Sequence, residues 1–347
     1  MARADLGVHL VGSLCGAETA SDAFRKSTAA FPNRLRRLPD GEPGHRGGFT
    51  GFQREVLARH IPEAIRDWTL QTPGPAIPAA QLAATLAKLP SPLATGYDAA
   101  AIESYATFAQ LRAAGAIPAR TRFQVCLPTA AGVMVFAATG YQAALEPVYE
   151  RALVAALRGV LAAVPPDDLA VQVDVASEIA TLEGVYYPHC APYYPGPVLA
   201  HVVERVRVLV DAVPPEVEVG LHLCYGDLGH EHFVQPRDTG LLVEVAGAVM
   251  KAVGRGLQWV HLPVPKDRDD EAYFEPLKGL EWGQTELYLG LVHPGDAEGT
   301  ERRLRTAERV LGHRRFGVGS ECGMGRTPAE EFESIAKIST EVSSPVV

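Results

Sequence analysis

The residues best suited to chemistry in this chain are a histidine and two cysteines in two distant segments. His222 and Cys224 are separated by one residue at the end of an apolar run, and Cys322 ends another apolar run. Side chains two positions apart on a β-strand point to the same face, so an imidazole and a thiolate would lie together. Two thiolates and an imidazole favour Zn²⁺ over Mg²⁺ or Ca²⁺. We therefore predict that the three residues bind zinc; the alternative is that His222 makes a core hydrogen bond and the cysteines fill space.

A fourth zinc ligand is expected at His261, which lies in the next apolar run along the chain. A histidine at this position could equally hold another ligand in place or contact the substrate, and the sequence leaves these roles open. Further histidines fall in segment 230–232 and at His189, beside Cys190. We expect the first segment to form a solvated loop or lid and the second to line the cleft.

The elements that would position these residues alternate along the chain. Short runs rich in Val, Leu and Ile predict eight buried parallel strands, at 7–13, 35–41, 121–128, 169–175, 217–224, 257–262, 286–292 and 316–322. Longer stretches predict helices at 97–115, 141–163, 196–213, 238–254, 297–312 and 328–340. This count indicates an α/β fold, a single (β/α)8 TIM barrel. A doubly wound open sheet is disfavoured because no GxGxxG phosphate loop follows the first strand.

Residues 1–347 are expected to form one domain. Segment 42–96 is rich in Pro, Gly and Ala and has no clear strand, so we interpret it as an insertion after the second strand, with a helix near 53–68. No linker divides the chain, and with 47% hydrophobic residues it can bury a large core.

The predicted strands bring reactive groups to one rim of the barrel. The active site of such a barrel lies at the C-terminal ends of its strands. Seven of the eight predicted strands end in a polar, ionisable or metal-binding residue. These residues are Ser13, Asp40 with Glu42, Asp174, His222 with Cys224, His261, His293, and Glu321 with Cys322. Chance would place fewer such groups there, so the sequence predicts a catalytic face.

The composition argues against several kinds of partner. The net charge of -9 disfavours nucleic acid, whose phosphates require clustered Lys and Arg. No apolar stretch is long enough to span a membrane, and the first residues lack the pattern of a signal peptide. The five cysteines show no disulfide spacing, which fits a reducing compartment, so we expect a cytoplasmic protein. The sequence leaves the oligomeric state open, a homo-oligomer included.

Short motifs along nearly the whole chain resemble the catalytic barrel of cobalamin-independent methionine synthase. That family belongs to the superfamily that also holds the uroporphyrinogen decarboxylase-like barrels. The similar segments are residues 11–13, 40–43, 123–129, 171–174, 222–225, 293 and 321–323. The resemblance implies the same barrel fold and a zinc site at His222, Cys224 and Cys322.

The resemblance also implies roles for polar residues of the rim. Glu42 and Asp174 fall where the family binds its amino-acid substrate, and Ser13 falls in the Gly-Ser segment that opens its first strand. The chain departs from the family at His261, where the family has a zinc-ligating Glu, and at 175–176, where it has Glu-Pro. The large N-terminal barrel of methionine synthase has no counterpart here, so the resemblance implies the zinc and thiol chemistry more strongly than the methyl donor.

The predicted function is a zinc-dependent methyl or alkyl transferase whose thiol substrate is activated as a zinc-bound thiolate. Its cofactor would be Zn²⁺, and its partners a small-molecule thiol and a methyl or alkyl donor. His293 aligns with the family's catalytic histidine and is expected to protonate the leaving group. Ser13, Glu42 and Asp174 are expected to hold the polar end of the substrate. The alternatives are a zinc-dependent lyase or hydrolase, a decarboxylase-like enzyme on the same barrel, and a non-catalytic zinc-binding protein.

Overall fold

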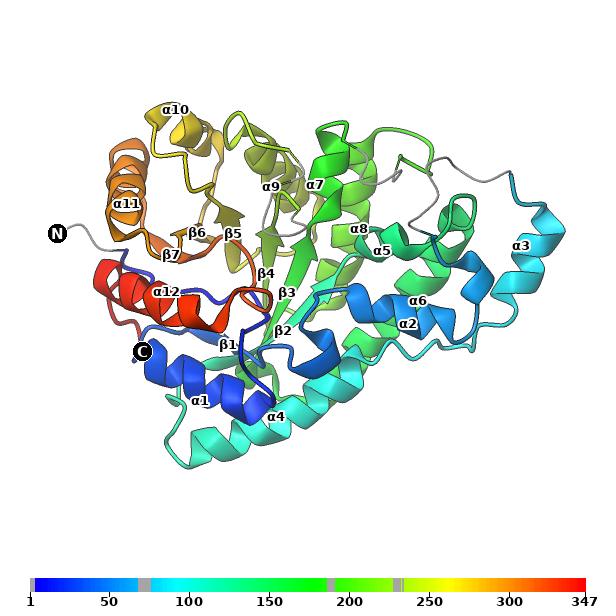
Figure 1. Cartoon of the computed structure of the whole chain (residues 1–347), viewed down its shortest axis with the longest axis horizontal. Coiled ribbons are helices and arrows are strands. Elements are labelled where there is room, and N and C mark those ends of the chain that lie inside the picture. The colour runs from blue at the N-terminus through cyan, green and yellow to red at the C-terminus, as the bar shows by residue number, and fades with distance from the viewer. Residues whose placement is uncertain (1–3, 68–75, 186–190, 227–231, 233) are drawn as a thin grey trace.

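A computed structural model of the chain describes residues 4–67, 76–185, 191–226, 232 and 234–347 (Figure 1). In this part of the chain, one seven-stranded sheet runs in chain order, and every neighbouring pair of strands is parallel. Its strands are β1 (Arg37–Pro39), β2 (Arg122–Pro128), β3 (Leu169–Val175), β4 (Glu218–Leu223), β5 (Trp259–Pro263), β6 (Glu286–Val292) and β7 (Phe316–Ser320). Six of them lie within segments predicted as strands, and β5 extends one residue beyond its predicted segment, 257–262.

Segment 7–13, predicted as the first strand, closes the ring without forming a regular strand. Val8 makes parallel bridges both to the chain just before β1 and to β7. Further along, the carbonyl of Val11 accepts a 2.6 Å hydrogen bond from the side-chain amide of Gln172, where a regular strand would receive one from a neighbouring backbone. The predicted TIM barrel is thus confirmed, with seven regular strands and one irregular segment between the first and the last.

Several strands end earlier than the apolar runs that predict them. The run at 217–224 contains β4, which stops at Leu223, and the run at 316–322 contains β7, which stops at Ser320. Cys224 and Cys322 therefore lie just beyond their strands, in the first residues of loops at the C-terminal end of the barrel.

Helices cover the outside of the curled sheet (Figure 1). They are α1 (Ala20–Ala30), α2 (Gly51–Ala58), α3 (Ala79–Leu86), α4 (Tyr97–Ala113), α5 (Ala130–Val133), α6 (Gln142–Ala163), α7 (Ser177–Leu182), α8 (Val198–Ala212), α9 (Gly240–Ala252), α10 (Glu271–Phe274), α11 (Ala297–Leu311) and α12 (Ala329–Val342). The six predicted helices are all present, as α4, α6, α8, α9, α11 and α12. Within the described residues, no helix is both long and apolar enough to cross a membrane.

Helix α1 was not expected from the sequence, although its start carries a recognisable signal. The Thr19 hydroxyl accepts from the backbone N–H of Asp22, whose carboxylate accepts from the backbone N–H of Thr19. This reciprocal pair is a capping box, which satisfies two backbone donors at a helix N-terminus.

The helix predicted near 53–68, in the insertion after β1, is shorter than expected, and a second helix, α3, lies further along the insertion where none was predicted. Helix α2 ends at Ala58, and a short 3-10 turn, Pro62–Ala64, follows it. Pro62 has no backbone N–H and cannot continue an α-helix, which explains why the helix expected at 53–68 stops early. The end of that predicted helix, at Trp68, lies outside the described residues.

A buried group of charges fills the N-terminal end of the barrel. The Arg37 side chain is 4% exposed, and it donates to Glu218 at 2.6 Å and to Glu286 at 2.9 Å. Its guanidinium lies 4.1 Å from the centre of the Trp259 ring. That ring occupies the space that a side chain at Gly220 would fill. Arg37, within the second predicted strand, thus points inward, and its positive charge is compensated there by two carboxylates.

Candidate metal centre

One level of the barrel interior carries three of the predicted site residues. Asp174 on β3 pairs in register with His222 on β4, and His222 pairs in register with His261 on β5. Residues in register on parallel strands point to the same face of the sheet. All three side chains are buried, so they enter the interior together.

His222, Cys224 and Cys322 form a compact group, called here the His–Cys–Cys cluster. Their candidate ligand atoms all lie within 4.8 Å of one another. The sulfur of Cys322 lies 3.7 Å from the sulfur of Cys224 and 3.7 Å from Nε2 of His222. The two sulfurs are too far apart for a disulfide, whose S–S bond is about 2.05 Å. Neither cysteine forms a disulfide.

The spacing of the His–Cys–Cys cluster fits a tetrahedral zinc ion. Zinc bonds of about 2.3 Å to sulfur and about 2.0 Å to nitrogen, at tetrahedral angles, separate two sulfurs by about 3.8 Å and a sulfur from a nitrogen by about 3.5 Å. The two distances from the Cys322 sulfur are within about 0.2 Å of these values. The cluster could therefore hold a metal such as zinc.

His261 lies behind the cluster. Its Nδ1 is 2.9 Å from Nδ1 of His222, so one ring donates a hydrogen bond to the other. This contact leaves Nε2 of His222 directed toward Cys322. Burial lowers the pKa of His261 to about 3, and burial followed by the proximity of His261 lowers the pKa of His222 well below its usual value. Both rings are thus neutral at pH 7, and the structure does not bring the expected fourth ligand, His261, into the cluster.

Two predicted substrate-binding acids face the same interior. Asp174 is 4% exposed, and its Oδ1 accepts a 2.8 Å hydrogen bond from Gln172. Burial, followed by the nearby Glu42, raises the pKa of Asp174 well above its usual value. Burial, followed by Asp40, raises the pKa of Glu42 to about 8. A Cβ on Gly12 would lie 3.2 Å from the Glu42 carboxylate, so the bare backbone there gives that acid room.

Asp40 and Ser13 hold the loops of the rim. The Asp40 carboxylate accepts from Arg46 at 2.6 Å and from the Ser104 hydroxyl at 2.7 Å. The Ser13 hydroxyl accepts a 3.0 Å hydrogen bond from the backbone N–H of Gly325. Ser13, predicted to bind substrate, thus also fixes the turn that follows Cys322.

His293 lies just after β6, beside Glu321. Its Nε2 donates a 2.8 Å hydrogen bond to the carbonyl of Val264, and its Nδ1 lies 4.0 Å from the Glu321 carboxylate. That carboxylate also lies 2.9 Å from the His232 ring. Burial is the main cause of a lowered pKa of His293. His293 is not among the described residues that line the cavity beside the cluster.

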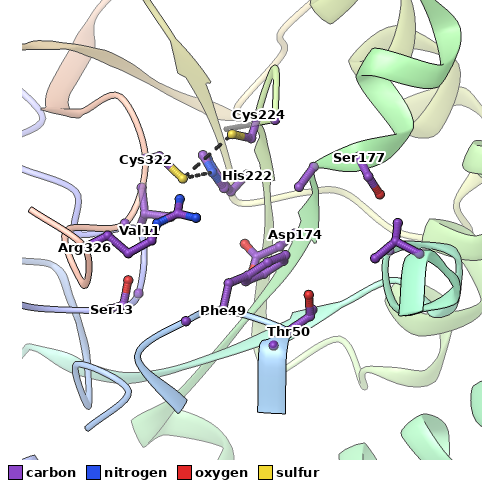
Figure 2. A pocket seen from close by; sticks show the side chains of 18 of the residues that line it. Val11, Ser13, Phe49, Thr50, Asp174, Ser177, His222, Cys224, Cys322 and Arg326 are labelled. Atoms are coloured by element: carbon purple, nitrogen blue, oxygen red, sulfur yellow. Dashed lines mark hydrogen bonds between the residues drawn. The ribbon is translucent and has the colours of Figure 1, made fainter. Parts of the chain in front are cut away.

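That cavity has a volume of about 430 Å³ (Figure 2). Its polar lining includes the three cluster residues together with Ser13, Glu42, Thr50, Asp174, Ser177, Thr181 and Arg326. Apolar lining comes mainly from Val11, Phe49, Val135, Phe136, Ala176 and Ala180. Figure 2 shows Asp174 between Phe49 and the cluster, so the two kinds of lining meet near this acid. The volume suits one or two small molecules.

Sequence analysis missed Arg326 and the glycine-rich segment 47–51, both of which line the cavity. The signals were present, because Arg326 closely follows Cys322 and segment 47–51 closely follows Glu42. Of the loop histidines considered, His189 and its neighbour Cys190 lie outside the described residues. So do His230 and Glu231; His232 contacts Glu321, as described above.

Comparisons with known proteins give structural matches only. No protein-family model and no curated protein sequence matches this chain. A protein from Listeria monocytogenes, assigned as a vitamin-B12-independent methionine synthase, aligns with 98% of this chain and 96% of its own, with a TM-score of 0.52 and 12% identity. A B12-independent methionine synthase from Shewanella, solved with selenomethionine, aligns with 70% of this chain, with a TM-score of 0.47 and 12% identity. This chain covers 65% of the Shewanella protein.

The Listeria match confirms the resemblance inferred from the motifs at the level of fold. At 12% identity it shows a shared barrel and leaves the reaction to be argued from the site itself.

Proposed function

We propose that this protein is a zinc-dependent transferase that moves a methyl or alkyl group onto a thiol. The observation that carries the proposal is the close grouping of the ligand atoms of the His–Cys–Cys cluster, all within 4.8 Å of one another, on the wall of a substrate-sized cavity. Three protein ligands leave one position for a substrate, as in other catalytic zinc sites. A zinc ion held by His222, Cys224 and Cys322 would supply the positive charge that lowers the pKa of a bound thiol and favours its thiolate form at neutral pH.

His261 has a positioning role in this proposal. A ligating histidine is held by a hydrogen bond to its other ring nitrogen, which fixes both its tautomer and its orientation. The 2.9 Å contact between His261 and Nδ1 of His222 is of this kind. It presents Nε2 of a neutral His222 to the sulfurs, and a neutral ring is the form that binds metal.

Glu42 and Asp174 bind the polar group of a substrate in this proposal. Burial comes first among the causes that raise the pKa of each acid, to about 8 for Glu42, so burial favours the protonated form of each. A protonated carboxyl can donate a hydrogen bond to a substrate. A substrate cation would instead favour the ionised forms, because an opposite charge lowers the pKa of an acid.

His293 is the proposed proton donor to the leaving group. Burial lowers the pKa of His293, which makes its protonated form a stronger acid and a smaller fraction of the ring at neutral pH. We expect His293→Gln to retain zinc and thiol binding but to slow transfer about 100- to 10,000-fold. Loss of zinc in this variant would instead assign His293 a structural role through its contact with Glu321.

The alternative functions find less support in the site. A closed structural zinc site needs four protein ligands, whereas the described residues bring together three. A hydrolase needs an acidic zinc-bound water, and two thiolate ligands reduce the positive charge that would acidify it.

The experiment that tests the proposal is X-ray absorption at the zinc edge, with and without a panel of thiols. We expect about one zinc per chain, bound by two sulfurs, with a further sulfur when a substrate thiol is added. Cys15→Ala is the matched control, because Cys15 is also buried and free but lies outside the cluster. Zinc that is absent from carefully prepared protein, or a sulfur count that no thiol changes, would overturn the proposal.

A further inference from the structure

Arg303 is a buried cation that the proposed zinc and thiol chemistry does not use. It lies on α11, the helix that follows β6 and packs against it. Its side chain is 1% exposed, and an arginine in a protein keeps its charge. Burying a guanidinium is costly unless its N–H groups are paired. The partners of Arg303 therefore indicate what this arginine holds in place.

Arg303 connects the two loops that follow β5 and β6. Its Nε donates to the carbonyl of Leu291 at 2.9 Å, and its Nη1 donates to the carbonyl of Lys266. Its Nη2 donates to the Asp296 carboxylate at 2.9 Å and to the Thr300 hydroxyl at 3.2 Å. All three nitrogens of the planar guanidinium are thus used. The single nitrogen of a lysine could not serve both loops in this way.

His293 lies between the segments that Arg303 connects. It comes two residues after Leu291, at the end of β6. Its ring is bonded to the carbonyl of Val264, which comes two residues before Lys266. Arg303 therefore fixes the backbone on both sides of the 2.8 Å contact between Nε2 of His293 and the Val264 carbonyl.

That contact determines which nitrogen of His293 carries a hydrogen. A carbonyl only accepts, so Nε2 is the donor. Burial lowers the pKa of His293, which favours the neutral ring, and a neutral ring has one N–H. Nδ1 lies 4.0 Å from the carboxylate of Glu321, beyond hydrogen-bond distance. Nδ1 is therefore the nitrogen left to exchange a proton, on the side of the loop that contains Cys322.

We propose that Arg303 is a positioning residue, which holds His293 so that Nδ1, and not Nε2, exchanges a proton with the site. The inference rests on the proposed function, in which His293 is the proton donor. When the protonated ring loses its Nδ1 hydrogen, it becomes the neutral form with hydrogen on Nε2, which the Val264 carbonyl already accepts. The ring then keeps one orientation in both protonation states.

The test measures the tautomer of His293 by ¹⁵N NMR on protein labelled at histidine. The chemical shifts of the two ring nitrogens show which one carries the hydrogen, and the signals absent from His293→Gln identify this ring. We expect the form with hydrogen on Nε2 to exceed the other by about tenfold in wild type, as one good hydrogen bond allows. A wild-type ring with its hydrogen on Nδ1 would overturn the inference.

Variants assign this preference to Arg303. We expect Arg303→Lys to lower the ratio of the two tautomers by about threefold or more, because the two loops lose their common donor. Arg255→Lys is the matched control, since Arg255 also donates to loop carbonyls, those of Val213 and Val217, but just before β4. It should keep the wild-type ratio. If Arg303→Lys does not fold, Asp296→Asn replaces it, because it removes the charge paired with Arg303 and should lower the ratio in the same way.

The possible failures are distinguishable. A wild-type ratio in the Arg303 variant, or an equal fall in the Arg255 variant, overturns this inference and leaves the transferase proposal standing. Wild-type protein that binds no zinc overturns the transferase proposal, while the tautomer ratios still show whether Arg303 positions His293.

Discussion

The two ends of the barrel interior handle buried charge in opposite ways. At the N-terminal end, Arg37 has carboxylate partners at 2.6 and 2.9 Å, on Glu218 and Glu286. Burial alone would lower the pKa of Arg37, but Tyr288 and the two glutamates together outweigh burial and raise it. At the C-terminal end, burial raises the pKa of both Glu42 and Asp174, so their charged forms are not fully compensated.

This difference separates structure from function within one fold. At the N-terminal end, the buried charge of Arg37 is compensated by carboxylates of the same chain. This is expected for the end of such a barrel that contributes to stability. The C-terminal end has two thiols outside any disulfide, two acids with raised pKa values and a cavity. Groups with perturbed pKa values in a cavity are typical of functional sites.

The largest expected effect is on stability, when the ion pairs of Arg37 at the N-terminal end are removed. Arg37→Ala removes the buried cation between Glu218 and Glu286, which keep only the more exposed Arg122 and Arg36. We expect the free energy of unfolding to fall by about 3 kcal/mol. Urea denaturation at neutral pH measures it. Arg36→Ala is the matched control, because Arg36 lies 3.6 Å from Glu286 and its side chain is 35% exposed; it should cost less than about 1 kcal/mol. Equal losses in the two variants would remove the basis of the comparison.

At the opposite end, removal of a cluster residue should affect metal binding far more than folding. We expect Cys322→Ala to weaken zinc binding by more than about 100-fold, since even the loss of a residue that only supports a ligand costs 10- to 100-fold. Competition with a chromophoric chelator measures the affinity. In the presence of excess chelator, the variant should unfold close to wild type. A metal-free variant much less stable than metal-free wild type would contradict this view of the C-terminal end.

His261→Ala tests whether His261 is itself a metal ligand or only holds the ligand His222 in place through their hydrogen bond. We expect zinc affinity to fall by about 10- to 100-fold, with the zinc-to-sulfur signal retained in zinc-saturated protein. The same chelator competition, run beside Cys322→Ala, gives the two losses on one scale. A loss as large as that of Cys322→Ala would restore His261 as the fourth ligand.

The smallest expected effect is on pH dependence. The pKa of Glu42, raised to about 8 from 4.5 mainly by burial, means that folded protein keeps a proton that the unfolded chain has lost. In zinc-free protein the free energy of unfolding should therefore fall as pH rises from about 4.5 to about 8. Glu42→Gln should flatten this slope and be most favourable, relative to wild type, near pH 8. Urea denaturation of both proteins across this range measures the slope, and parallel profiles would contradict the raised pKa.

The sequence predicted the regular parts of the barrel because buried parallel strands read as continuous apolar runs. It failed at segment 7–13, where the carbonyl of Val11 is bonded to a glutamine side chain that is distant in sequence. The helix in the insertion also ends earlier than predicted, because a 3-10 turn that begins at Pro62 follows it.

Within the site, His222, Cys224 and Cys322 could be selected because their residue types limit what they bind, and the structure brings them together. The place of His261 could not be predicted, since its register opposite His222 specifies proximity but not which ring atoms meet. Arg326 was missed because its approach depends on how closely two glycines let one loop pack against Ser13.

The clamp between Ser13 and the turn at Gly325 joins residues 312 positions apart. Contacts this distant in sequence make folding slow, because a long loop must be closed before they stabilise anything. During synthesis, segment 7–13 is made early, but its bridge to β7 cannot form until β7 has been made. In the same way, the metal cluster cannot form until Cys322 has joined His222. Ring closure and assembly of the metal cluster are therefore late and coupled events, so zinc uptake would report that the barrel has closed.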